Sequence, residues 1–376
     1  MRFGVYVHFA FCPYVCPYCD FAKWPYRASE ARRYLDALDA ELMREPSRSA
    51  TTIYLGGGTP NTYDAGTLCA FVERVRAHFP LTESWQEITV EVNPELVKLR
   101  DFADYRAAGV TRVSVGVQSF DERETRTLGR RHTPGDVRET VLRARNAKLE
   151  SVNLDLIFGI PGQTSRSWRT SLETAIALEV DHVSAYGLTI EEGTRFAKLY
   201  AREPQQFASD ETQAEFYEIA IDMLAAAGYE QYEISNFARP GHRSVHNENY
   251  WNNGEYVGLG VGAASYRQGV RSVHTRSLGD YVRAALSGVP IPGESERLEG
   301  KRRVGEAIML ALRTAQGVRL DAFKERYGID VLEDYAPVVA TYAAAGFLER
   351  DTNAVRLTRR GRLVANEVCG AFLALT

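Results

Sequence analysis

Short apolar, β-branched runs alternate with longer segments of helical periodicity over about the first 190 residues of the chain. The predicted strands are Phe3 to His8, Thr52 to Leu55, Glu87 to Val92, Arg112 to Gly116, Ser151 to Phe158 and His182 to Leu188. The predicted helices are Ser29 to Arg44, Ala65 to His78, Lys98 to Ala108, Pro134 to Ala147 and Ser165 to Leu178. This alternation indicates βα units on a parallel sheet, in a partial or complete barrel or in a doubly wound sheet that shares the pattern. The fold class is therefore α/β.

The pattern changes twice after residue 204. A predicted helix from Asp210 to Ala227 leads into a stretch rich in Gly, Asn, Tyr and His, which is typical of loops over a site. The run from Ser287 to Glu296 holds two prolines and two glycines and predicts a linker, because these residues disfavour both helix and central strand. We therefore divide the chain into a core at 1–204, an extension at 205–290 and a C-terminal domain at 298–376.

The C-terminal segment has the order of a small helical domain with a β wing. Its predicted elements are helices at Lys301 to Thr314, Leu320 to Tyr327 and Ala336 to Ala345, a hairpin from Phe347 to Leu357 and a last helix from Thr358 to Leu373. Winged-helix domains often bind DNA. Here we expect a packing or partner role, because fold alone does not fix function and the net charge of -4 offers no excess of cations to a polyanion.

Composition narrows the class of protein. Of 376 residues, 45% are hydrophobic and 25% charged, which is typical of a globular chain with a large core. The first residues lack the charged, apolar and small-residue order of a secretory signal, and no apolar run approaches the ~20 residues that span a bilayer. We expect a cytoplasmic protein with at most peripheral membrane contact and no nucleic-acid partner.

Three of the five cysteines fall within eight positions, on a loop directly after the first predicted strand. Cys12, Cys16 and Cys19 look unlike a disulfide framework and more like a metal site in a reducing compartment. Three thiolates leave one iron of a four-iron cluster open to an outside ligand, whereas a zinc site would need a fourth ligand, for which His8 is the candidate. Cys69 and Cys369 are expected to be structural thiols.

The cysteine spacing resembles the Cys-x3-Cys-x2-Cys signature of the radical S-adenosylmethionine (SAM) superfamily. A glycine-rich turn from Gly56 to Pro60 follows the second predicted strand, where bare backbone can approach a cofactor. The resemblance implies a partial (β/α)6 TIM-like barrel and a [4Fe-4S] cluster whose open iron chelates the amino and carboxylate groups of SAM. It also implies a reduced flavodoxin or ferredoxin as electron donor.

Further motifs resemble the oxygen-independent coproporphyrinogen III oxidase family along the whole chain. They are Tyr6 to Cys12, Gly56 to Pro60, Glu91 to Glu95, Gly116 to Phe120, Arg130 to His132 and Asn153 to Gly162. The resemblance implies a set of SAM-contacting positions, namely Tyr6, Tyr18, Gly57, Gly58, Thr59, Glu91, Gln118, Arg130 and Asp155. Carboxylates can accept from ribose hydroxyls or an amino group, and the planar guanidinium of Arg130 can hold a carboxylate.

Two departures point to one branch of that family. The oxidases carry a further cysteine where this chain has Phe21, which places oxidation of a porphyrinogen in doubt. The run from His246 to Trp251 matches the His-Asn-x-x-Tyr-Trp motif of the heme chaperone branch. Its imidazole could ligate heme iron, while Tyr250 and Trp251 supply aromatic surface. His242 is an alternative ligand. A purely structural alternative is that His246 and its aromatic neighbours only pack beneath a loop.

The sequence thus predicts a heme chaperone that carries a SAM-liganded [4Fe-4S] cluster and passes heme to client proteins. The alternative is a radical SAM decarboxylase that acts on the propionate groups of coproporphyrinogen III. Modification of RNA is a third reading, but it predicts a basic added domain, and the segment from Arg350 to Arg362 offers only a short basic cluster.

Overall fold

The computed structural model describes residues 2–82 and 86–373, and its largest feature is one mixed sheet. Within the described residues this sheet has twelve strands in the order β14-β13-β12-β11-β1-β4-β5-β6-β7-β8-β10-β9. Six of them are the predicted parallel strands: β1 (Phe3–Phe9), β4 (Thr52–Gly57), β5 (Glu87–Val92), β6 (Arg112–Gln118), β7 (Ser151–Phe158) and β8 (His182–Gly187). The α/β prediction is confirmed.

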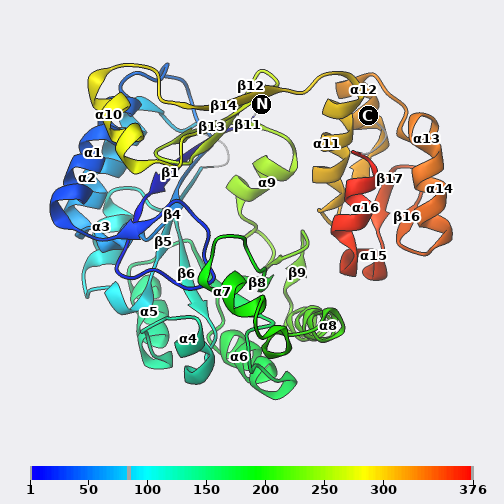
Figure 1. The fold of residues 1–376 in the computed structure, drawn as a ribbon, viewed down its shortest axis with the longest axis horizontal. Helices are drawn as coiled ribbons and strands as arrows, with labels where there is room; N and C mark the ends of the chain where they lie inside the picture. The colour runs from blue at the N-terminus through cyan, green and yellow to red at the C-terminus, as the bar shows by residue number, and fades with distance from the viewer. Residues whose placement is uncertain (1, 83–85, 374–376) are drawn as a thin grey trace.

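Helices cover the outer face of the parallel strands, and the sheet is curved (Figure 1). The helices of this region are α1 (Ala28–Leu42), α2 (Ala65–His78), α3 (Asp101–Ala107), α4 (Glu122–Thr127), α5 (Pro134–Asn146), α6 (Ser165–Ala177), α7 (Arg195–Tyr200) and α8 (Asp210–Ala226). Local sequence fixes several of their starts. For α5, Thr133 and Asp136 form a reciprocal capping box around a proline at the first turn.

Alternation along each strand separates an apolar outer face from a polar inner one. In β5, Ile88 and Val90 join the main hydrophobic core, whereas Glu91 lines a cavity on the other side. In β7, Leu154 joins the core and Asp155 lines the same cavity. Because successive strand residues point to opposite faces, the outer residues pack under the helices and the inner ones are free for chemistry.

The region from 205 to 290 contributes strands to the sheet, which the prediction of loops over a site missed. β11 (Glu255–Leu259) pairs in parallel with β1, and β12 (Ala264–Arg267) and β13 (Val270–His274) continue antiparallel. At the opposite edge, β10 (Asn236–Ala238) pairs antiparallel with β8 and β9 (Glu230–Gln231) with β10. Two helices complete this region, α9 (Val245–Trp251) and α10 (Leu278–Ser287).

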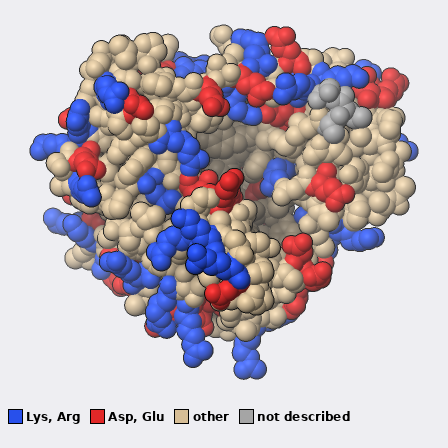
Figure 2. Space-filling view, in the orientation of Figure 1, with Lys and Arg blue, Asp and Glu red and all other residues tan. Residues whose placement is uncertain are grey.

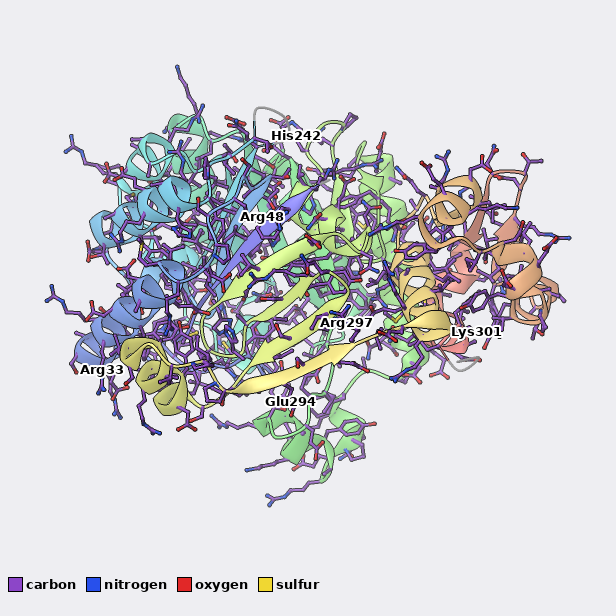
Figure 3. The ribbon with its side chains drawn as sticks, turned by 90° about the horizontal axis from the view of Figure 1, so that it is seen from above. Arg33, Arg48, His242, Glu294, Arg297 and Lys301 are labelled. Carbon is purple, nitrogen blue, oxygen red and sulfur yellow. The ribbon has the colours of Figure 1, made fainter. Side chains whose placement is uncertain are left out.

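The predicted linker is in part a strand. β14 (Gly293–Arg297) pairs antiparallel with β13 through five residue pairs, although all five of its residues are exposed. Pro290 and Pro292 precede the strand and therefore remove no hydrogen bond from it. Figure 3 shows β14 running from Glu294 to Arg297 along the sheet edge toward Lys301, where the C-terminal helices begin.

The C-terminal segment forms a second hydrophobic cluster beside the curved sheet (Figure 1). Its helices are α11 (Gly300–Leu312), α12 (Leu320–Tyr327), α13 (Val331–Asp334) and α14 (Ala336–Ala344), and its three-stranded sheet has β15 (Val318–Arg319), β16 (Leu348–Arg350) and β17 (Ala354–Leu357). The predicted last helix is divided into α15 (Arg359–Leu363) and α16 (Ala365–Ala371), because Val364 leaves the helical conformation with φ -118° and ψ 28°. Among the described residues, no helix combines the length and the apolar character that crossing a membrane requires.

Candidate functional site

A cavity of about 530 Å³ opens at the carboxyl ends of the parallel strands, where α/β barrels place their sites. Figure 2 shows the molecule hollowed on this face between the curved sheet and the C-terminal cluster. The cavity brings together the three predicted cluster ligands and eight of the nine predicted SAM positions. These are Cys12, Cys16 and Cys19, with Tyr18, Gly57, Gly58, Thr59, Glu91, Gln118, Arg130 and Asp155.

The cysteine loop is anchored at its first thiol. Cys12 ends β2 (Phe11–Cys12), which pairs with β3 (Trp24–Pro25), and burial raises the pKa of its thiol to about 11. Burial also raises the pKa of Cys19, whose carbonyl accepts from Lys23 Nζ at 2.5 Å. Because a thiol must lose its proton to bind iron, metal binding at these residues releases protons.

The glycine turn leaves bare backbone beside the thiols. Gly57 has φ +95°, and a Cβ on Gly58 would lie 2.3 Å from the carbonyl oxygen of Phe9. A Cβ on Gly56 would lie 2.7 Å from the carboxylate of Glu91. A side chain at Gly58 would clash with backbone, and Gly57 and Gly58 present bare backbone to the cavity.

Two carboxylates project into the cavity from β5 and β7, the strands on either side of β6. Glu91 accepts from Tyr54 Oη at 2.7 Å and from the Gly57 amide at 3.1 Å, and burial raises its pKa to about 7. Asp155 accepts from Ser114 Oγ at 2.8 Å and from Asn153 Nδ2 at 2.8 Å. Both acids keep lone pairs for the hydroxyl or amino donors of a ligand.

Arg130 is one of two cationic side chains that line this cavity, the other being Lys23. Its Nη2 donates to Asn93 Oδ1 at 2.9 Å and to the Gly116 carbonyl at 2.5 Å. Its Nε is buried without a hydrogen-bond partner within the described residues. An unpaired buried donor beside three thiols and two carboxylates fits a zwitterionic ligand such as the methionyl end of SAM, so the donor set suits the cluster and SAM.

His8 is not available as the fourth ligand of a zinc site, because both of its ring nitrogens are hydrogen-bonded. Nε2 lies 2.7 Å from the carbonyl oxygen of Ala22 and Nδ1 lies 3.0 Å from Tyr6 Oη. A carbonyl only accepts, so the proton sits on Nε2 and Nδ1 accepts from Tyr6. Burial lowers the pKa of His8 to about 4.

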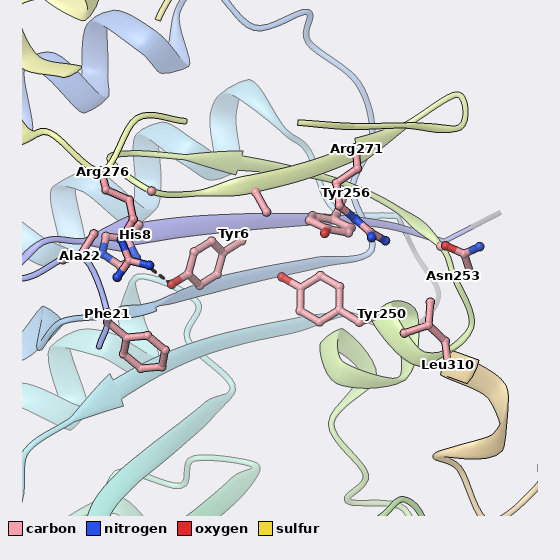
Figure 4. A pocket seen from close by; sticks show the side chains of 13 residues that line it. Tyr6, His8, Phe21, Ala22, Tyr250, Asn253, Tyr256, Arg271, Arg276 and Leu310 are labelled. Atoms are coloured by element: carbon pink, nitrogen blue, oxygen red, sulfur yellow. Dashed lines mark hydrogen bonds between the residues drawn. The ribbon is translucent and has the colours of Figure 1, made fainter. Parts of the chain in front are cut away.

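A second cavity of about 380 Å³ adjoins the first, and it contains Tyr6, the ninth predicted SAM position. Phe21 lines both cavities and is thus a shared wall. Figure 4 shows Tyr6, Tyr250 and Tyr256 facing this second space, with Leu310 from α11 at one end. Its remaining lining includes His8, Arg271 and Arg276.

His246 lies behind this second cavity and is not among its lining residues. Its side chain stacks on Tyr54 with ring centroids 5.0 Å apart, and its Nδ1 lies 2.7 Å from Thr52 Oγ1. Its Nε2 lies 2.7 Å from Tyr250 Oη. Both nitrogens are therefore engaged, and burial lowers the pKa of His246 to about 3.

The other two motif candidates lie outside both cavities. The guanidinium carbon of Arg313 lies 5.4 Å from the ring centroid of Trp251. The buried Nε1 of Trp251 has no partner among the described residues. The rival ligand His242 faces Asp181, with Nε2 3.9 Å from Oδ1, and its side chain is 34% exposed. Only Tyr250 of the predicted heme residues reaches the second cavity.

The predicted site residues did not include several inner residues that complete the first cavity. They include Tyr14, Tyr54, Asn93, Ser114 and Tyr186. Tyr54, Asn93 and Ser114 lie two residues from the motif residues Gly56, Glu91 and Gly116, so strand alternation was the signal that could have found them. Tyr14 lies on the cysteine loop, and its hydroxyl donates to Glu95 at 2.5 Å.

Comparison with known proteins identifies relatives along the whole chain. The model of the radical SAM superfamily matches residues 6–175, and that of the HemN C-terminal domain matches residues 298–364. The chain is 35% identical to the heme chaperone HemW of Bacillus subtilis, over 98% of this chain and 99% of that protein. It is 33% identical to the heme chaperone HemW of Escherichia coli, over 99% and 98%.

A solved structure has the same fold. The coproporphyrinogen III oxidase HemN of Escherichia coli, a radical SAM enzyme, superposes with a TM-score of 0.86 at 22% identity. The match covers 100% of this chain and 91% of HemN.

Proposed function

This chain belongs to the heme chaperone HemW family of radical SAM proteins, and from that membership we propose that it binds heme and transfers it to client proteins. Heme binding, cluster binding and transfer are the parts of this proposal to be tested. The two relatives are named heme chaperones and match almost end to end, whereas the likeness to HemN concerns the fold.

The observation that carries the proposal is the second cavity. The helix of the His246 to Trp251 motif places Tyr250 against it, and Tyr6, Tyr256 and Phe21 supply further aromatic surface. Aromatic faces suit a flat macrocycle, and the guanidinium groups of Arg271 and Arg276 suit its carboxylates. A heme-sized ligand would lie next to the cluster cavity, across Phe21.

We propose that Cys12, Cys16 and Cys19 hold a [4Fe-4S] cluster and that the other first-cavity residues hold SAM. The bound cluster and SAM would supply one-electron chemistry there. Glu91 and Asp155 would accept from ribose or amino donors, and Arg130 would hold the carboxylate. The glycine turn would lie against the methionyl end. Tyr6, which lines the second cavity, would contact SAM only at the boundary between the two spaces.

The remaining partners follow from this chemistry. A reduced flavodoxin or ferredoxin would supply the electron, and heme-receiving proteins would be the clients. We place the protein in the cytoplasm, because free thiols and an iron-sulfur cluster call for a reducing compartment. The C-terminal helices, which line the heme cavity through Leu310, would serve a packing or client-docking role rather than nucleic-acid binding.

An anaerobic heme titration of cluster-reconstituted protein tests the proposal. The Soret band is followed for wild type and His246→Ala side by side. Saturable binding near one heme per chain supports the chaperone function, and weakening in the variant shows that the motif contributes. If neither protein binds heme, the chaperone proposal fails, and decarboxylation of coproporphyrinogen III is then assayed with the same preparations.

A further inference from the structure

We propose that the heme iron is coordinated by the phenolate of Tyr250, with His246 as the positioning residue behind it. This inference rests on the proposed heme binding and names the ligand at that site. It reverses the expectation from residue type, in which the histidine ligates the metal and the tyrosine supplies only surface.

Placement in the fold separates the two side chains. Tyr250 lines the second cavity, whereas His246 does not. His246 lies on the concave face of the sheet, where a Cβ on Gly4 would come within 3.2 Å of its Cε1. Tyr54 stacks on one side of its ring, and the ring of Tyr250 meets it at 80° with centroids 4.7 Å apart. An iron atom in the cavity therefore meets the phenol before the imidazole.

The hydrogen bonds of His246 suit a supporting role. Thr52 Oγ1 lies 2.7 Å from Nδ1, and Tyr250 Oη lies 2.7 Å from Nε2. A threonine hydroxyl can donate or accept, so Thr52 supports either neutral tautomer of the ring. Burial and the nearby charge of Arg112 lower the pKa of His246 to about 3, so the ring is neutral at neutral pH. It accepts from the phenol and can donate to a phenolate.

Coordination of ferric heme by Tyr250 needs no change of oxidation state. The O–H bond of Tyr250 breaks, an iron–oxygen bond to ferric heme forms, and one proton leaves to solvent. The imidazole then donates its Nε2–H to the bound oxygen while Nδ1 accepts from Thr52. Burial raises the pKa of Tyr250, so the free phenol stays protonated until the iron binds. Tyrosine is an established axial ligand of ferric heme in other folds.

The cavity holds other groups that can bind iron, and each is already committed. His8 Nδ1 accepts from Tyr6 Oη, and its Nε2–H donates to the Ala22 carbonyl. The ring of Tyr256 packs edge-on to Tyr250 with centroids 4.6 Å apart. Arg271, whose guanidinium bonds to Glu306 on α11, also interacts with the Tyr256 hydroxyl. Two cavity tyrosines meet an imidazole in the described residues, Tyr250 with His246 and Tyr6 with His8. The Ala22 carbonyl fixes the His8 proton on Nε2, so His8 Nδ1 can only accept, whereas Thr52 lets His246 donate to a phenolate.

The test uses hemin with cluster-reconstituted wild type, Tyr250→Phe, His246→Gln and Tyr256→Phe. Resonance Raman spectra report an iron–phenolate vibration, and electron paramagnetic resonance reports the ferric spin state. We expect a phenolate signature in wild type and in Tyr256→Phe, its loss in Tyr250→Phe, and a shifted signature in His246→Gln. Hemin affinity of Tyr250→Phe should fall at least tenfold, with far-ultraviolet circular dichroism unchanged.

The outcomes separate this inference from the proposed function. A histidine signature in wild type that persists in Tyr250→Phe overturns Tyr250 as the ligand and leaves the chaperone proposal standing, with His246 or His8 as the ligand. Loss of the phenolate signature in Tyr256→Phe instead also overturns it. No hemin binding by wild type overturns both. If Tyr250→Phe fails to fold, the wild-type spectra and those of His246→Gln still decide between phenolate and imidazole.

Discussion

Tyr54 and Glu91 share a hydrogen bond of 2.7 Å between the phenol oxygen and Oε1 at the floor of the first cavity. The other carboxylate oxygen accepts from the Gly57 amide, so one acid ties two strands and the glycine turn together. The group is partly buried in the cavity wall and has Asp155 as an acidic neighbour. Its ionisation therefore opposes the fold while preparing the site for a cationic or hydroxyl-bearing ligand.

Replacing this acid should stabilise the ligand-free protein at alkaline pH. The pKa of Glu91 rises from 4.5 to about 7 in the fold, so its contribution to stability is full below pH 4.5 and is lost as the pH rises through 7. We expect Glu91→Gln to raise the free energy of unfolding at pH 8 by about 1–2 kcal/mol, after the loss of one acceptor. Denaturant unfolding at pH 8 and pH 4.5 measures this difference.

A matched control is Glu73→Gln on the outer face of α2, which is exposed and should change stability equally little at both pH values. The same Glu91→Gln protein should bind SAM more weakly than wild type. A gain in stability that is the same at pH 4.5 and pH 8 would contradict burial of the charge as its cause.

Substitution of Cys16 and substitution of Cys69 should have different effects on the iron-sulfur cluster. Cys16→Ser should remove the intact cluster and its absorbance near 400 nm, because a serine oxygen is a poor substitute for an iron-binding thiolate. Cys69→Ser on α2 should keep the full complement, since Cys69 does not line the cavity. Iron and sulfide analysis after reconstitution measures both. Retention of a full iron and sulfide content in Cys16→Ser would falsify the cluster assignment.

Arg130 and its neighbour Arg131 offer another matched pair. Arg130 lines the cavity and has a buried Nε without a partner among the described residues, whereas Arg131 is exposed and lies over the ring of Tyr14. Arg130→Lys keeps the charge but loses the planar fork, so SAM affinity should fall at least tenfold, about 1.4 kcal/mol. Arg131→Lys should change it less than twofold. Anaerobic calorimetry with cluster-reconstituted protein measures both, and equal affinities would remove Arg130 from the SAM site.

The sequence predicted the parallel strands well, because the apolar pattern and the family motifs agree in this part of the chain. In β1 the outer residues Val5 and Val7 are fully buried, while Tyr6 and His8 point inward, so apolar and family patterns fall on opposite faces of one strand. Eight of the nine predicted SAM positions gather in one cavity for the same reason, because they lie on the inner face of a parallel strand or in the connection that follows it.

Prediction was weakest where partners are distant in sequence. β11 pairs with β1 across some 250 residues, and its short run of Val257 and Leu259 gives little local signal. The exposed β14 is a strand because its backbone pairs with β13, and composition alone does not reveal this pairing. The surroundings of His246 were also beyond sequence, because Thr52, which contacts its Nδ1, is 194 residues away.

Arg326 links the C-terminal cluster to α9 and should control the stability of that helix. From α12 its Nη1 and Nη2 donate to the carbonyl oxygens of Asn252 and Asn253, both at 2.7 Å, at the end of α9. Arg326→Ala leaves these carbonyls without charged donors, so we expect a loss of about 1–2 kcal/mol in local stability. Hydrogen exchange of the amides of α9 should accelerate roughly 5- to 30-fold. Arg360→Ala, on α15, should leave α9 unchanged. Equal protection of α9 in both variants would show that the sheet alone holds the motif helix.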